Sequence, residues 1–86
     1  MHELSLVASL CATAEAVARK EGATRVTGIS VRLGALSHLS SDHLRDHLHQ
    51  AAAGSMLDGA RVEVTVDPDA SAPGAQDIEL LSIEVV

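Results

Sequence analysis

The chain has 86 residues and no aromatic side chain, so its core must be built from Leu, Val, Ile and Ala. This length fits a single domain, residues 1–86. The formal charge of −6 argues against a nucleic-acid or anionic-membrane surface, because both favour clustered cations. The single cysteine excludes an internal disulfide and a zinc site made of several cysteines. No apolar run is long enough to span a membrane and no signal-peptide pattern is present, so we expect a soluble cytoplasmic protein.

Residues 4–20 are predicted to form a helix, because their apolar side chains recur at steps of three and four residues. The stripe consists of Leu4, Val7, Cys11, Ala14 and Ala18. Cations suit the last turn of a helix, which holds Arg19 and Lys20, and Gly22 follows as the expected left-handed terminator. Because Cys11 belongs to the stripe, we expect a buried, unreactive thiol.

Residues 24–33 switch to the alternation of a half-buried strand, with Ile29, Val31 and Leu33 on one face. Val26 falls on the opposite parity, which indicates a bulge near Gly28.

A second helix is predicted over residues 41–53, between a serine N-cap and the terminator Gly54. Either Ser40 or Ser41 can serve as the cap. The predicted apolar face consists of Leu44, Leu48, Ala51 and Ala52.

The second predicted strand covers residues 60–67 and has valines facing the core, at Val62, Val64 and Val66. Residues 67–76 are rich in Pro, Gly, Ala and Ser and are predicted to be a loop without a core residue. The last strand covers residues 77–86, and its parity changes between Leu80 and Leu81, which indicates another bulge.

These elements, in the order α-β-α-β-β, predict a two-layer α/β (α+β) fold. Strand–helix–strand over residues 25–67 implies a right-handed parallel crossover. The simplest packing places two helices on one face of a three-stranded mixed sheet. The position and direction of the last strand stay open.

The chain begins Met-His-Glu, which places an imidazole beside a terminal amine. The Met1 amine, the His2 amide nitrogen and His2 Nδ1 can close two chelate rings on one metal ion. Such nitrogen donors suit a metal that can deprotonate an amide and accept square-planar ligands, which indicates Ni(II) or Cu(II). The Glu3 amide can replace the amine, and another imidazole or a partner can complete the set. On the residues alone, an accidental histidine is the commoner explanation.

A second group of histidines consists of His38, His43, His47 and His49. His43 and His47 are four residues apart on one flank of the predicted helix and are close enough to share a metal ion. A polar helix flank with one half-buried histidine is the commoner explanation of the pair. No nucleophile–base pair or phosphate-binding loop is present, so the sequence does not predict an enzyme.

Four segments together resemble the HypA family of hydrogenase nickel-incorporation proteins: "MHELSL", "GALSHLSSDHLR", "AAAGSMLDGARVEV" and "LLSIEVV". The resemblance implies a nickel metallochaperone that acts in [NiFe]-hydrogenase maturation, with a HypB-like GTPase and the hydrogenase large subunit as partners. It also implies that the Met-His-Glu start, here Met1, His2 and Glu3, is the Ni(II) site.

The family carries a zinc ribbon with two Cys-x-x-Cys pairs between the last two strands, whereas this chain has only the loop over residues 67–76 there. We therefore expect a single HypA-like domain without structural zinc. A metal-independent interaction or dimerisation module that kept this fold is the alternative to nickel delivery, and a homodimer is compatible with either. A third reading makes His43 and His47 the metal site.

Overall fold

The computed structural model of the chain describes residues 2–37 and 39–86, with side chains from Ser5 onward within these ranges. The elements follow the predicted order: α1 (His2–Lys20), β1 (Val26–Leu33), α2 (Ser41–Ala52), β2 (Arg61–Val66) and β3 (Ile78–Val85). Within the described residues, no helix is long and apolar enough to cross a membrane.

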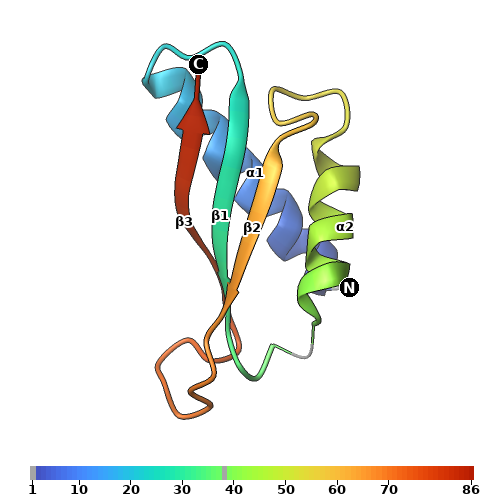
Figure 1. The fold of residues 1–86 in the computed structure, drawn as a ribbon, viewed down its shortest axis with the longest axis vertical. Helices are drawn as coiled ribbons and strands as arrows, with labels where there is room; N and C mark the ends of the chain where they lie inside the picture. The colour runs from blue at the N-terminus through green and yellow to red at the C-terminus, as the bar shows by residue number, and fades with distance from the viewer. Residues whose placement is uncertain (1, 38) are drawn as a thin grey trace.

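The three strands form one mixed sheet with the strand order β2-β1-β3. The central strand β1 pairs in parallel with β2 and antiparallel with β3. Both helices cover the same face of this sheet (Figure 1). The predicted two-layer fold is therefore confirmed, and the structure adds the position and direction of β3 that the sequence left open.

The core lies between the helices and this face of the sheet and is aliphatic. Val7 of α1, Leu44 of α2 and Val31 of β1 are all at most 1% exposed. The buried cluster draws its other members from α1, β1, α2 and the connections that flank α2: Leu10, Cys11, Ala14, Ala18, Val26, Ile29, Leu33, Leu39, Leu48, Ala52, Leu57 and Ala60. Both β1 and the described parts of the two helices thus bury most of the positions that their hydrophobic periodicity predicts. The side chain of Leu4, on the predicted α1 stripe, lies outside the described residues.

The helix ends have the predicted chemistry. Gly22 and Gly54 follow α1 and α2 with φ of 74° and 78°, which only glycine adopts without strain. Of the two candidate caps, Ser40 is the N-cap of α2, since its Oγ accepts a hydrogen bond from the His43 amide at 3.1 Å.

The predicted apolar positions at the ends of two elements are wrong. Ala51 is exposed, although it was placed on the apolar face of α2. Figure 1 gives the reason: α1 starts beside the first half of α2 and then runs away from it, so it does not cover the last turn. Val66, predicted to face the core, is 53% exposed at the last position of β2, which is an edge strand of the sheet.

Both predicted bulges are present in the β1–β3 pairing. The register shifts between Val26 and Gly28, and again between Ser30 and Val31. At the second shift Ser30 pairs with Ser82 and Val31 with Leu80, so Leu81 is the extra residue. Leu81 is 51% exposed, whereas its neighbour Leu80 packs against the core.

The loop between β2 and β3 is closed at its base by two adjacent residues of the chain. The Asp67 amide donates to the Leu33 carbonyl, and the Gly34 amide donates to the Asp77 carbonyl, both at 2.9 Å. The two ends of the loop therefore lie next to each other, which lets loops of different length and content occupy this place without changing the sheet.

The prediction that this loop lacks a core residue is wrong, since Ala75 is only 7% exposed. The Leu36 amide donates to the Ala75 carbonyl at 2.7 Å, and this contact folds the loop back onto the end of β1. Alanine gives no periodic signal within a loop, so the sequence could not reveal this burial.

Arg32 holds the base of the loop through its guanidinium group. Its Nε donates to Glu79 at 2.9 Å, its Nη1 lies 3.6 Å from Asp67, and its Nη2 donates to the Gly74 carbonyl at 3.4 Å. The hydrogen bond to Glu79 is the main cause that raises the Arg32 pKa. Within the loop, hydrogen bonds from Ser71 lower the pKa of Asp69.

Candidate metal centre

The Met-His-Glu start lies at the beginning of α1. Met1 falls outside the described residues, as do the side chains of His2 and Glu3. The backbone of His2 and Glu3 belongs to the first turn of α1. The first four amide groups of a helix have no acceptor within that helix, so a metal can engage these nitrogens without breaking a helical hydrogen bond.

This first turn lies beside the first half of α2 (Figure 1). The first seven residues of α2 include His43 and His47, whose rings are nearly parallel, with 10° between the planes and 6.4 Å between the centroids. His43 is exposed and His47 is half-buried. The predicted helical pair is therefore formed, and it lies at the end of α2 that is next to the start of α1.

Among the described side chains, the third histidine of α2 does not join this pair. His49 is exposed in the last turn of α2, and its position lies on a different side of the helix. His38 lies outside the described residues. Among the described side chains, no group of three or more His, Cys, Asp or Glu residues could hold a metal ion. The described part of α2 thus offers two imidazoles and needs donors from elsewhere.

The Cys11 thiol is unsuited to binding a metal. It is 8% exposed and belongs to the core cluster, as its place on the helical stripe predicts. Burial, with a smaller contribution from the charge of Glu15, raises the pKa of this thiol above its usual value. A buried, protonated thiol is a poor ligand and a poor nucleophile.

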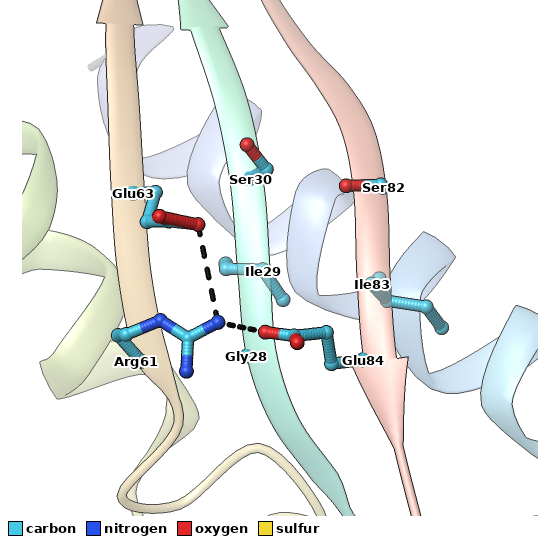
Figure 2. A pocket seen from close by; sticks show the side chains of 8 residues that line it. All are labelled: Gly28, Ile29, Ser30, Arg61, Glu63, Ser82, Ile83 and Glu84. Carbon is cyan, nitrogen blue, oxygen red and sulfur yellow. Dashed lines mark hydrogen bonds and ion pairs between the residues drawn. The ribbon is translucent and has the colours of Figure 1, made fainter.

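The outer face of the sheet carries a shallow polar hollow of about 280 Å3 (Figure 2). Its charged side chains are already paired: Arg61 forms ion pairs with Glu84 and, at 3.9 Å, with Glu63. The alternation that turns Val62 and Val64 inward turns Arg61 and Glu63 outward, but the sequence could not bring Glu84 to them, because the position of β3 was open. We assign no metal chemistry to this hollow.

Comparison with known proteins identifies the family. The family model "Hydrogenase/urease nickel incorporation, metallochaperone, hypA" matches residues 1–72. A hydrogenase maturation factor HypA from Roseiflexus sp. (strain RS-1) is 46% identical over 68 residues, which are 79% of this chain and 55% of that relative. The HypA of Methanopyrus kandleri is 39% identical over 67 residues, 78% of this chain and 47% of the relative. The chain thus spans about half the length of these curated relatives.

Solved structures show the same fold. The solution structure of the Ni metallochaperone HypA from Helicobacter pylori superposes with a TM-score of 0.80 at 19% sequence identity, over 98% of this chain and 97% of that one. A second HypA solution structure gives a TM-score of 0.78 at 21% identity, over 100% of this chain and 97% of that one. The fold agrees with the sequence match, and the chain belongs to the HypA family of metallochaperones.

Proposed function

We propose that residues 1–86 form a single nickel-binding accessory domain that holds Ni(II) at its N-terminus and delivers it during [NiFe]-hydrogenase maturation. The observation that carries this proposal is the family match, which begins at residue 1 and so includes the Met-His-Glu start. The curated relatives carry the name hydrogenase maturation factor, and the similarity to them extends over more than three quarters of this chain.

The proposed ligands are Met1, His2 and Glu3. The imidazole Nδ1 and the amide nitrogen of His2 serve as fixed donors, and the Met1 amine or the Glu3 amide adds a third. Nitrogen donors that include deprotonated amides favour Ni(II) in a square-planar arrangement. These three donors leave one coordination position of the metal to an additional ligand. This suits a protein that carries nickel, because a ligand from a partner can enter at that position and remove the metal.

The proposed partners are a HypB-like GTPase and the large subunit of a hydrogenase. The loop over residues 67–76 stands where longer members of the family are expected to carry their zinc ribbon. Its closed base supports a domain that keeps its fold without the ribbon, since Asp67 and Asp77 are held together by Leu33 and Gly34.

The test is a nickel titration by calorimetry on a chain whose first residue is Met1. We expect His2→Ala to abolish specific binding, because it removes the imidazole donor and with it the chelate ring that joins Nδ1 to the His2 amide nitrogen. His49→Ala is the matched control, since it removes an exposed imidazole elsewhere. Binding should also weaken as the pH falls through the histidine range, because protons compete for the same nitrogens. Equal affinity of His2→Ala and wild type would refute the proposed site.

A metal-independent docking or dimerisation module is the second candidate, and the β3 edge of the sheet favours it. Arg45 of α2 donates to the Val62 carbonyl of β2 at 3.4 Å, which caps part of one sheet edge. On β3 the Glu84 carbonyl accepts a hydrogen bond from Thr27 of the neighbouring β1 at 3.3 Å, and the Leu81 and Val85 side chains are 51% and 37% exposed. A dimer mass by light scattering, combined with no specific nickel binding, would select this function over the first.

A further inference from the structure

We propose that the His43–His47 pair of α2 supplies the imidazole that completes nickel binding at the N-terminus, so that the metal bridges the starts of α1 and α2. This inference rests on the proposed function, because it takes the N-terminal donors as the other half of the site. It assigns a role to His43 and His47, which are not among the ligands of the proposed N-terminal site.

The flank of α2 that carries the pair faces α1. Leu44 and Leu48 are buried and point to the core, so they divide the helix into two flanks. Arg45 lies on one flank and reaches the Val62 carbonyl on β2, which is an edge strand of the sheet. His43 and His47 lie on the opposite flank at 3.6 residues per turn. Because α2 has β2 on one side and α1 on the other, this second flank is the one next to α1 (Figure 1).

The pair lies in the part of α2 that is beside the beginning of α1. Positions 43, 47 and 51 follow one another along the flank, one turn apart. His47 is half-buried, whereas Ala51, one turn later, is exposed. This difference follows the path of α1, which begins beside the first half of α2 and leaves it before the last turn (Figure 1). The pair is therefore level with the part of α1 that follows the N-terminus.

The chemistry of the pair suits the metal. Two histidines four residues apart on one helix face can bind the same metal ion. Imidazole nitrogen is a preferred ligand of nickel, and the N-terminal donors leave one position for such a ligand. A metal–imidazole bond is about 2.0–2.1 Å long, so two rings on one metal have centroids about 6 Å apart or closer. The observed 6.4 Å therefore places both rings within side-chain reach of one metal ion, and either ring can fill the one open position.

The experiment compares nickel affinity and ligand number in four chains that begin at Met1. These are wild type, the double variant His43→Gln with His47→Gln, the control His49→Gln, and His2→Ala. Circular dichroism first verifies that each chain keeps its fold. Calorimetry with NiCl2 then gives affinity, and X-ray absorption spectroscopy counts imidazoles per nickel.

We expect the double variant to bind nickel at least about tenfold more weakly, since removing even an outer partner of a metal ligand costs that much. The imidazole count should fall by at least one, while His49→Gln should match wild type. If the double variant binds nickel as tightly as wild type while His2→Ala does not bind it, this inference is overturned and the proposed function stays intact. Loss of binding in the double variant alone would make the pair an independent site. No specific binding by wild type would refute both proposals.

Discussion

Arg61 of β2 and Glu84 of β3 form an ion pair that crosses the central strand β1 over Gly28 (Figure 2). A Cβ at position 28 would lie 2.7 Å from Oε1 of Glu84 and 3.1 Å from Nη2 of Arg61. The pair therefore depends on a glycine in the strand that separates its two partners. Both side chains are more than half exposed, at 58% and 61%, so we expect a contribution of only about 0.2–1 kcal/mol to stability.

A double-mutant cycle with Arg61→Ala and Glu84→Ala should give a coupling energy in this range. The coupling should shrink in 1 M salt, because the pair is solvent-exposed. In the Gly28→Ala background it should fall close to zero, since the new methyl group occupies the path of the pair. Urea unfolding of wild type and the seven variants measures both values. A coupling that survives Gly28→Ala unchanged would show that the pair does not need the glycine.

Gly34→Ala should destabilise the protein far more than Gly28→Ala. A Cβ at position 34 would lie 2.2 Å from the carbonyl oxygen of Ala75 and 2.8 Å from that of Gly74, both of which are backbone atoms. The loop must then detach from the end of β1, and we expect a loss of about 1–3 kcal/mol. At Gly28 the obstructing atoms are the ends of two flexible side chains, so the cost should be below about 1 kcal/mol. Urea unfolding that gives equal losses would contradict this explanation.

Cys11 should make the stability of the protein fall at alkaline pH. Burial raises the pKa of its thiol in the folded state, so the fold favours the protonated form. Its contribution is complete below the unfolded pKa of about 8.5 and is lost as the pH rises through the folded value. The difference in unfolding free energy between wild type and Cys11→Ala should therefore be smaller at pH 9.5 than at pH 7.5. A difference that does not change with pH would contradict the assignment.

The apoprotein should keep its fold in the presence of a chelator. The described core contains only apolar side chains and the Cys11 thiol, so no metal-binding group contributes to its packing. Thermal melts followed by circular dichroism with and without excess EDTA should coincide. A large drop in the melting temperature with EDTA would show that a metal is structural.

Local sequence determined the elements and their ends. The three- and four-residue steps in α1 and the alternation in β1 depend only on backbone geometry, which repeats with a fixed period. Ser40 and Gly22 mark helix ends because their chemistry satisfies or releases backbone groups within a few residues. The Met-His-Glu start likewise offers nitrogen donors on adjacent residues, and their use as a metal site stays a prediction.

The tertiary structure decided which distant residues meet. Arg61 and Glu84 are 23 residues apart, and only the strand order β2-β1-β3 brings them to either side of Gly28. The burial of Ala75 and the exposure of Ala51 depend on where a loop folds back and where α1 leaves α2. The position of His43 and His47 beside the start of α1 has the same origin. Periodicity defines the face of an element, but only packing defines what that face meets.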